Sequence, residues 1–418
     1  MKAVEIIIIG PGSRGEAYAQ FAKESPEQCK VVGIAGPDNY RRQKMIKDFN
    51  LSADKIFDCW SQVVAIGKKI ADAVIICTHD DMHAEPAIAF ANLKYNILLE
   101  KPMATTENDC RRIVNSIKQN DVIFSVCHVL RYTNYSKKLK EIINSGIAGD
   151  IVNIQHVEPV GSWRHVHSYV RGNWSKEEDS TFMLLSKSCH DLDWIQYIMD
   201  QKIARVSSFA SLRHFKKSEQ PKGATERCLD CPKHIEATCP YSAKRIYNKF
   251  IEQGQLGRPL DMVVAKPNKK NVEKALRTGK YGRCVYACDN DVVDNQLVNI
   301  EFKNHSSASF IMTAFSANSG RRSIIYGTKA QIIVEPNKIE IFDFINEKTK
   351  TINLNLSGNS ILDRHNGGDR GVIKNFIEAI IANDQSMIIS GPDVSLENHI
   401  AVFKAEQARK NKTVELVR

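Results

Sequence analysis

The 418-residue chain contains no run of about 18 consecutive apolar residues, so we expect no membrane-spanning helix. It also contains no internal repeat and no low-complexity tract, which excludes a repeat array. The apolar segment Val4–Ile9 is interrupted by Glu5 and precedes a glycine-rich turn instead of a small-residue cleavage site. We therefore expect a buried strand there and not a signal peptide, and no contact with a membrane.

No dense basic tract is present, although Lys and Arg number 58 against 48 Asp and Glu, for a net charge of +10. A nucleic-acid-binding protein normally concentrates its positive charge on one face, so we expect no nucleic-acid partner. The hydrophobic fraction of 43% and the charged fraction of 25% are typical of folded domains. The length predicts two or three domains.

A regular disulfide framework is also lacking. The eleven cysteines are an odd number, and six of them lie scattered singly before residue 190. Without a secretory signal, this usage indicates a reducing compartment, and we expect a cytoplasmic protein.

The first 130 residues alternate continuous apolar runs with amphipathic helical segments. This pattern predicts a parallel sheet covered on both faces, which is a doubly wound nucleotide-binding domain over residues 1–130. The predicted strands are Val4–Ile9, Val31–Ala35, Ala73–Cys77, Asn96–Leu99 and Ile123–Val126, and two predicted helices are Ser13–Lys23 and Arg41–Phe49.

Strands with few helices between them follow residue 150, which predicts a mostly antiparallel sheet within residues 131–418. Residues 216–290 are rich in Lys, Pro, Cys and Gly, which is typical of an insertion or long loop. The predicted strands are Ile151–Val157, Val206–Ser211, Val292–Phe302, Ala308–Phe315, Ser323–Tyr326, Ala330–Glu335 and Ile339–Asp343, and the predicted helices are Met183–Met199, Arg370–Ala382 and Ser395–Lys410.

The turn after the first strand has the pattern G-x-G-x-x-G, formed by Gly10, Gly12 and Gly15. The first glycine permits a tight turn, the second lets the backbone approach a pyrophosphate, and the third lets the helix pack on the strand. The helix that begins with Ser13 and Arg14 would direct its N-terminus at the anion. We predict a dinucleotide site.

The choice between NAD and NADP stays open. The acid that normally binds the ribose hydroxyl should end the second strand, but position 36 is glycine. Asp38 could bind the 2′-hydroxyl instead, whereas Arg41 could meet a 2′-phosphate. Arg41 and Arg42 could also be an ordinary solvated start of a helix.

Several further motifs are found along the chain: Ala73–Thr78, His83, the tripeptide Glu100-Lys101-Pro102, Arg131, the linker 145–152, and a helix carrying His190 and Asp193. Together with the glycine-rich turn they resemble the Gfo/Idh/MocA family. The resemblance implies a Rossmann domain followed by an α+β domain with an open, mainly antiparallel sheet. It also implies hydride transfer between a nicotinamide and a sugar, polyol or cyclitol-like substrate.

By the same resemblance, Lys101 and His190 are the expected catalytic residues, and Thr78, His83, Glu100 and Lys101 belong to the cofactor site. The chemistry is consistent with these residue types. Oxidation of a secondary alcohol needs a base for the hydroxyl proton, and histidine suits this near neutral pH. A lysine can stabilise the developing alkoxide.

The helix of His190 departs from the family pattern. The family has an aspartate four residues before the histidine and a glycine two before it, whereas this chain has Ser186 and Ser188. One usual carboxylate is therefore absent. Lys187 is adjacent but projects about 100° away around the helix, so the reaction could differ from the standard dehydrogenase.

A further set of polar and aromatic side chains is expected to contact substrate. The segment 163–174 is dense in aromatic and polar groups and could line a sugar pocket or form an ordinary structured loop. Asp369, near His365, could reach the site or only cap the last-but-one helix. The candidate substrate residues are Arg131, Trp163, His167, Lys187, Asp193 and His365.

Five cysteines gather in the 216–290 segment: Cys228, Cys231, Cys239, Cys284 and Cys288. Two-residue spacing and thiolate ligands suit a structural zinc, held by four of the five, and His234 is a further possible ligand. An iron–sulfur site and free or packed thiols are the alternatives.

These features predict an NAD(P)-dependent oxidoreductase that acts on CH–OH groups of a carbohydrate-like small molecule. We also expect a homo-oligomer, a dimer or tetramer, formed through the C-terminal sheet. One alternative is an NAD-dependent glycosidase or lyase that oxidises its substrate transiently. Another is a non-catalytic sugar or nucleotide sensor, which the missing carboxylate at position 186 would permit.

Overall fold

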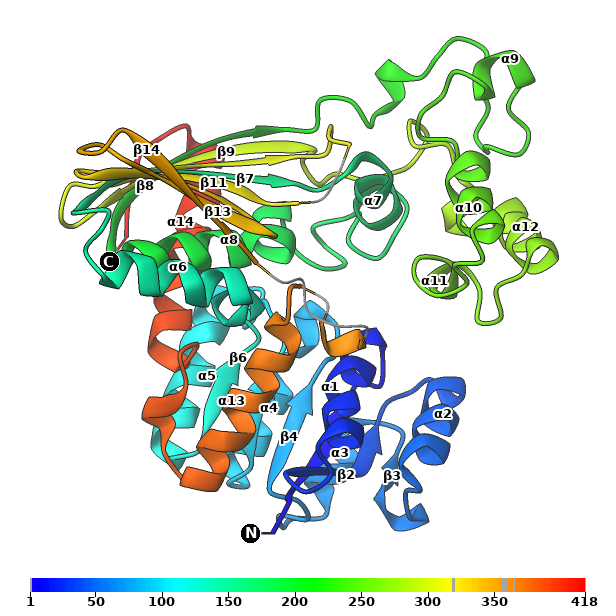
Figure 1. The fold of residues 1–418 in the computed structure, drawn as a ribbon. Coiled ribbons are helices and arrows are strands. Elements are labelled where there is room, and N and C mark those ends of the chain that lie inside the picture. Colours follow the sequence, from blue (N-terminus) through cyan, green and yellow to red (C-terminus); the bar gives the residue numbers. More distant parts are fainter. Residues whose placement is uncertain (1, 318–319, 355–359, 364, 418) are drawn as a thin grey trace.

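The computed structural model describes residues 2–317, 320–354, 360–363 and 365–417. Its first sheet is parallel, with the strand order β3-β2-β1-β4-β5-β6 (Figure 1). The strands are β1 Val4–Ile9, β2 Cys29–Ala35, β3 Ile56–Phe57, β4 Ala73–Ile76, β5 Asn96–Leu99 and β6 Phe124–Val126.

Helices cover both faces of this sheet because its central strand is apolar on both sides. In β1, Ile6 and Ile8 belong to the hydrophobic cluster on one face, and Ile7 and Ile9 to the cluster on the other. This arrangement is the doubly wound Rossmann fold that the alternating pattern predicted. The helices are α1 Ser13–Glu24, α2 Asn39–Phe49, α3 Trp60–Ala65, α4 Ala84–Asn92 and α5 Glu107–Asn120.

The second sheet has nine strands in the order β14-β13-β12-β11-β7-β10-β9-β8-β15. In the described part of this sheet only β7 and β10 pair in parallel, and the remaining neighbours are antiparallel. The predicted fold class, a Rossmann domain plus a mainly antiparallel α+β domain, is confirmed. The strands are β7 Ile151–Pro159, β8 Ile203–Ser211, β9 Asn295–Phe302, β10 Ser307–Thr313, β11 Arg322–Gly327, β12 Ala330–Glu335, β13 Lys338–Asp343, β14 Lys348–Asn353 and β15 Glu415–Leu416.

Two helices, α6 (Asn134–Asn144) and α8 (Met183–Met199), lie between this sheet and the Rossmann domain (Figure 1). Helix α8 is almost wholly buried and packs on β7 and β10. A helix buried on nearly every side carries its polar residues inward. It therefore places Ser186, Lys187, His190 and Asp193 in the interior of the protein, close to the junction of the two sheets.

The end of the chain returns to the N-terminal domain. Helix α13 (Gly368–Ala382) places Val372 and Phe376 in the same hydrophobic cluster as β1, and α14 (Pro392–Asn411) packs on both α5 and α8. The two sheets therefore share helices. Within the described residues, no helix combines the length and apolar character that crossing a membrane requires.

The 216–290 segment is not a loop. It contains four helices around a small hydrophobic core of its own, and it projects to one side of the C-terminal sheet (Figure 1). The density of Lys and Pro hid a 3.6-residue apolar pattern, in which Ile246 and Tyr247 on one helix meet Val272 and Leu276 on another. The helices are α9 Lys233–Glu236, α10 Ala243–Glu252, α11 Leu260–Val263 and α12 Lys269–Thr278.

Candidate active site

The glycine-rich turn leaves room only for glycine at two of its positions. Gly10 has φ +89°, and a Cβ atom there would lie 2.5 Å from the carbonyl oxygen of Cys77. A Cβ atom on Gly15 would lie 2.5 Å from the carbonyl oxygen of Gly10. Strand β1, helix α1 and the end of β4 thus approach closely, and α1 begins at Ser13 with free backbone N–H groups. The residues present fit a dinucleotide pyrophosphate.

Position 36 is glycine because Pro11 occupies the adjacent space. A Cβ atom on Gly36 would lie 2.3 Å from Cδ of Pro11, so the usual acid cannot stand there. Asp38 instead is the N-cap of α2, where its side chain accepts a hydrogen bond from Arg41 N at 3.1 Å. The Arg41 guanidinium lies over Gly12, with Nη1 3.0 Å from where a Cβ atom would be.

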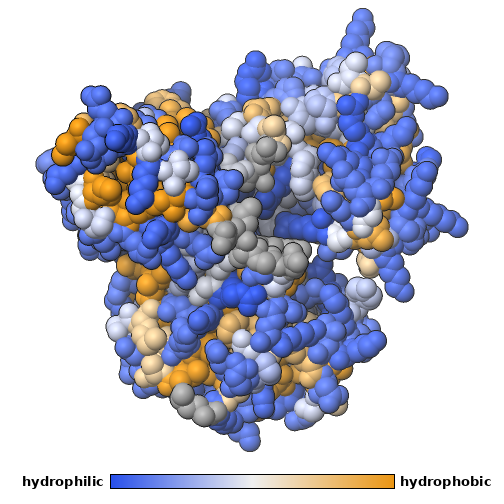
Figure 2. Space-filling view, viewed as in Figure 1, coloured by the Kyte–Doolittle hydropathy of each residue, from blue (hydrophilic) through white to orange (hydrophobic). Residues whose placement is uncertain are grey.

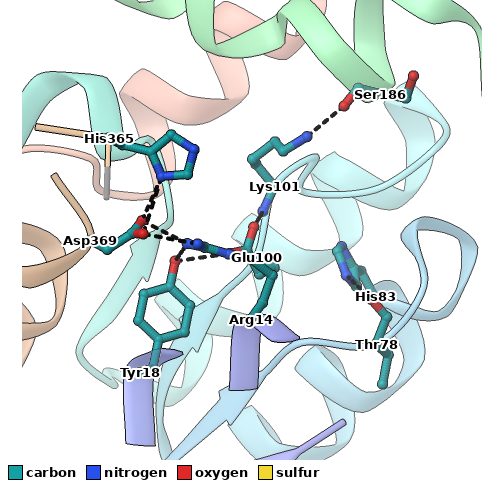
Figure 3. Close-up of polar contacts among 9 residues, drawn as sticks. All are labelled: Arg14, Tyr18, Thr78, His83, Glu100, Lys101, Ser186, His365 and Asp369. Carbon is teal, nitrogen blue, oxygen red and sulfur yellow. Dashed lines mark hydrogen bonds and ion pairs between the residues drawn. The ribbon is translucent and has the colours of Figure 1, made fainter. Parts of the chain in front are cut away.

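Arg14 does not project freely toward a phosphate. Its Nε donates to Glu100 Oε1 at 2.6 Å, and its two Nη atoms bind both oxygens of Asp369 at 2.8 and 3.0 Å (Figure 3). Tyr18, one turn further along α1, donates to the same Glu100 oxygen at 2.8 Å. The start of α1, the end of β5 and the start of α13 are therefore joined by one buried network.

Asp369 does not cap helix α13. The N-cap residue is Gly367, and the Asp369 carboxylate binds Arg14 and accepts from His365 Nδ1 at 3.1 Å. Burial alone raises the pKa of the Asp369 carboxyl, but the charges of Arg14 and His365 overcome it and hold the pKa well below its usual value. His365 lies at the edge of this network, with its side chain partly exposed.

Thr78 and His83 shape the loops at the carboxyl ends of β4 and β5. The Thr78 hydroxyl donates to the carbonyl oxygen of Met82 at 2.9 Å. The buried His83 ring bridges the two loops, with Nδ1 2.6 Å from the carbonyl oxygen of Pro102 and Nε2 3.3 Å from that of Thr78. His83 therefore holds these two loops together at the carboxyl edge of the sheet.

Lys101 connects the two domains. It follows β5, and its Nζ donates to the backbone carbonyl oxygen of Ser186 on α8 at 2.5 Å (Figure 3). His190 lies one helical turn further along α8. Burial, and then the positive charge of Lys101, lower the pKa of His190 well below its usual value, so its ring is neutral at neutral pH. Its Nδ1 atom is buried without a hydrogen-bond partner.

Arg131 and Asp193 form a buried ion pair at the domain junction. The guanidinium donates to both carboxylate oxygens, at 2.8 Å from Nε and 2.7 Å from Nη2. Arg131 also donates to the carbonyl oxygen of Ile389 at 2.7 Å. Because these hydrogen bonds occupy both side chains, the role of the pair is to hold α8 against the Rossmann domain.

Lys187 points into the C-terminal sheet and away from Lys101. Its Nζ lies 2.5 Å from Glu158 Oε1 on β7, and Arg321 binds both Glu158 and Asp191. Burial, which the Glu158 carboxylate opposes, lowers the pKa of Lys187 to about 8. This buried charge network adjoins the face of α8 that carries Ser186.

Trp163 and His167 contact the 216–290 segment. Trp163, on α7 (Ser162–His165), packs edge-to-face on Phe250 with a centroid distance of 5.0 Å. His167 Nδ1 lies 2.9 Å from the Tyr247 hydroxyl, and its ring stacks on Tyr281 at 4.8 Å. Within the described residues, the ring contacts and the hydrogen bond of these two side chains are with this segment, so they do not join the group around Lys101.

A cavity of about 460 Å³ opens at the carboxyl end of β4. His79, Asp81 and Met82 form its wall on the Rossmann side, and Arg171 and Lys280 belong to the opposite wall. Figure 2 shows the molecule hollowed where the N-terminal domain, the C-terminal sheet and the 216–290 segment meet. A polar cavity at the carboxyl end of β4 suits a hydrophilic ligand.

The predicted zinc site is not supported. In the part of the chain that the structure describes, no group of three or more His, Cys, Asp or Glu side chains is arranged to hold a metal ion. Cys288 does not line the cavity that the other four cysteines share, and its Sγ donates to the backbone carbonyl oxygen of Cys284. His234 lies on α9 and is not among the side chains around those cysteines.

The sequence analysis missed two buried groups beside the site. His128 follows β6 and lies between His190 and His399, with ring centroids 6.2 and 5.6 Å away. Neither of its ring nitrogens has a hydrogen-bond partner among the described residues, and Nδ1 lies 3.7 Å from Asp193 Oδ2. Its place after a parallel strand was a signal that could have found it. Glu158 is the last-but-one residue of β7, and no local sequence pattern marks it as special.

A Rossmann sheet with a glycine cradle, joined to an open sheet through a lysine and a buried helix, defines a two-domain protein with a dinucleotide-binding type of N-terminal fold. The sequence profile of an oxidoreductase family with an NAD-binding Rossmann fold matches residues 4–128, and that of the family's C-terminal alpha/beta domain matches residues 140–416. The chain belongs to the Gfo/Idh/MocA oxidoreductase family.

Two curated relatives and one solved structure are similar to this chain. The first relative is a 2,7-anhydro-N-acetylneuraminate hydratase of Mediterraneibacter gnavus, 26% identical over 48% of this chain and 50% of the relative. The second is an inositol 2-dehydrogenase/D-chiro-inositol 3-dehydrogenase of Lacticaseibacillus casei, 24% identical over 49% and 55%. The chain spans about half the length of the curated relatives it matches.

The solved structure is a levoglucosan dehydrogenase in complex with NADH and L-sorbose. It superposes with a TM-score of 0.72 and 16% identity over the whole of both chains. This likeness shows that the two proteins share a fold.

Proposed function

We propose that this protein is an NAD(P)-dependent oxidoreductase that transfers a hydride between nicotinamide and a secondary alcohol of a sugar, polyol or cyclitol. One observation carries the proposal: Lys101, at the end of a Rossmann strand, reaches across the domain junction to the helix that bears His190. Through this contact the Lys101 side chain lies at the same domain junction as the His190 ring.

In this proposal His190 and Lys101 act on the same substrate hydroxyl. The neutral His190 ring has a buried nitrogen without a partner, so it can accept the proton of a substrate hydroxyl. Lys101 stabilises the negative charge that develops on the substrate oxygen as that proton leaves. In the reverse direction the same groups return the proton to the carbonyl oxygen.

The cofactor fits the glycine-rich turn, where Gly10, Gly12, Ser13 and Gly15 would hold the pyrophosphate. Asp38 or Arg41 would meet the adenosine ribose, and Thr78 and Glu100 line the carboxyl ends of the next strands. When bound, the nicotinamide supplies the hydride acceptor or donor. The substrate would bind on the side of the junction that is lined or held in place by Arg131, Asp193, Lys187 and His365.

Mass spectrometry of nucleotide that co-purifies with the protein tests the cofactor. A panel of sugars, polyols and cyclitols, monitored by nicotinamide absorbance, tests the reaction. We expect at least one cyclic polyhydroxy compound to drive reduction of the oxidised cofactor. The non-catalytic sensor is favoured instead if the protein binds the cofactor tightly, turns over no compound of the panel, and keeps its ligand binding in the His190→Ala variant.

Transient oxidation is the second candidate. The similarity to a hydratase of an anhydro sugar supports it, and so does the buried Lys187–Glu158 pair, a second proton-handling group beside α8. Such an enzyme would convert its substrate while the cofactor returns to its starting state. Product formation without net change in nicotinamide absorbance distinguishes it from a dehydrogenase.

We further propose a homo-oligomer built on the C-terminal sheet, in the cytoplasm. The outer face of that sheet exposes large apolar side chains, among them Phe209, which is 66% exposed, and also Val152 and Ile311. Figure 2 shows hydrophobic residues gathered over the β13–β14 side of the sheet. The cysteines are all free, which fits a reducing compartment. Light scattering tests the assembly, and Phe209→Glu should dissociate it.

A further inference from the structure

Four of the five clustered cysteines line one small cavity within the 216–290 segment. They are Cys228, Cys231, Cys239 and Cys284, and the other lining residues are Pro221, Ala224, Thr225, Arg227, Ile235, Glu236, Ser242 and Tyr286. We call this space the four-cysteine cavity. Cys228 and Cys284 are each 8% exposed, so the site is closed on the side of the segment's core.

The backbone brings these residues together from distant positions. Arg227 and Arg283 form an antiparallel bridge, and Cys228 N donates to the carbonyl oxygen of Gly282 while Cys284 N donates to that of Glu226. The single helical turn of α9 then folds the chain back between Cys231 and Cys239. The convergence therefore depends on regular backbone pairing and does not arise from chance orientation of side chains.

A buried positive charge beside the cavity lacks a carboxylate partner. Arg171 is 2% exposed, donates from Nη2 to Cys228 Sγ at 3.4 Å, and forms no ion pair within the described ranges. Its Nη1 atom is buried without a hydrogen-bond partner. Burying an unpaired cation is costly, so a negative charge is expected close to it.

The four thiols that line the cavity supply that charge when a metal centre binds them. A metal centre deprotonates the thiols that ligate it, and four thiolates around such a centre carry a net negative charge. Arg171 and the amide of Gln220, whose Nε2 lies 3.7 Å from Cys284 Sγ, are then hydrogen-bond donors to ligand sulfur atoms.

Two kinds of metal centre bind four thiolates. Zinc binds four thiolates at about 2.3 Å each, which requires a compact group around one ion, and the described residues contain no such group. In a [4Fe–4S] cluster each thiolate binds a different iron, so the four sulfur atoms surround a space. We propose that the four-cysteine cavity holds a [4Fe–4S] cluster that clamps the 216–290 segment.

The cluster would also support one wall of the cavity beside the Rossmann domain. Arg171 contacts the cavity through Cys228 and lines the 460 Å³ cavity beside the Rossmann domain. A cluster that holds Arg171 in place would therefore also hold that wall of the cavity in place. The role inferred here is structural, and it does not depend on which substrate the protein uses.

The test is metal and sulfide analysis of the full-length protein, purified without oxygen or reconstituted anaerobically with ferrous iron and sulfide. We expect about four iron and four sulfide per chain, with the visible absorption of a thiolate-bound cluster. Stoichiometric zinc without that absorption, or protein that takes up neither iron nor zinc, would overturn the proposal.

Variants locate the cluster. Cys231→Ser and Cys239→Ser should each lower the iron content more than tenfold and expose the 216–290 segment to protease. Cys288→Ser and Cys59→Ser are the matched controls, because neither residue lines the cavity, and they should keep the full iron content. Full iron retention in both cavity variants would contradict the assignment, and the wild-type analysis remains decisive if a variant fails to fold.

Discussion

At the scale of single residues, the proposed chemistry depends on side chains that come from different domains. Lys101 follows a Rossmann strand, and His190 lies on a helix of the second domain, so neither can be positioned without the packing of the other's domain. Ser186 contributes its backbone carbonyl where the family's carboxylate would stand. The hydroxyl of Ser186 is not what Lys101 contacts.

The first prediction concerns this pair. Lys101→Ala and His190→Ala should each lower turnover by roughly 10²–10⁴-fold, because each removes one half of the proton handling. Affinity for the dinucleotide should be nearly unchanged and is measured by titration. The exposed residues Lys118 and His305 provide matched alanine controls. Near-normal turnover in either site variant would refute the assigned roles.

The second prediction concerns cofactor choice. Pro11 excludes an acid at position 36, and the Arg41 guanidinium lies over the glycine-rich turn. We expect NADP to be accepted, and Arg41→Ala to weaken NADP binding by roughly tenfold through loss of a charge-assisted bond to the 2′-phosphate. NAD binding should change little, and Lys44→Ala is the control. Strong exclusion of NADP by the wild type would show that Asp38 binds the ribose.

At the scale of elements, helix α14 holds the loop that carries Lys101. His399 on this helix accepts a hydrogen bond from Met103 N at 2.8 Å through Nε2, and its Nδ1 donates to the carbonyl oxygen of Ser395 at 2.7 Å. Both nitrogens are therefore used by a neutral ring. Burial lowers the pKa of His399 to about 3.

The third prediction follows from that pKa. The unfolded histidine takes up a proton near pH 6.5, whereas the folded one does so only near pH 3. Its contribution to stability is therefore complete above pH 6.5 and is lost as the pH falls toward 3, by up to about 1.4 kcal/mol per pH unit. Urea unfolding between pH 7.5 and 5 should show a smaller pH dependence for His399→Gln than for the wild type. An equal dependence would mean that His399 is protonated in the folded state.

At the scale of the whole molecule, a helix near the C-terminus packs against the N-terminal sheet. Helix α13 lies near the C-terminus, yet its apolar face fills the hydrophobic cluster beside β1, and Asp369 at its start binds Arg14 at the start of α1. The N-terminal sheet is therefore completed by residues more than 350 positions later in the sequence.

The fourth prediction tests this packing. Phe376 is fully buried against the first sheet, so Phe376→Ala should destabilise the protein by roughly 3–5 kcal/mol and weaken dinucleotide binding on heating. The more exposed Ile381 on the same helix, changed to Ala, should cost much less. Calorimetry with and without cofactor measures both. Equal effects of the two changes would show that α13 is not part of the N-terminal core.

Local patterns in the sequence determined the elements that depend on nearby residues. The strand Val4–Ile9 and the helix Met183–Met199 were predicted with the bounds that the structure has, because apolar periodicity marks them. The family was predicted from short motifs, among them the glycine-rich turn and the Glu-Lys-Pro tripeptide, and the family profiles confirmed it. The helices of the 216–290 segment were missed because charged residues masked their apolar faces.

Only the tertiary structure decided which side chains meet. Nothing local links Arg14 to Asp369, Arg131 to Asp193, or Lys101 to the carbonyl of Ser186, since each contact joins residues far apart in the sequence. The structure also separated the five cysteines into four that share a cavity and one that does not. Spacing along the chain carries no information on such contacts, because the packing of whole helices and sheets sets the distances between them.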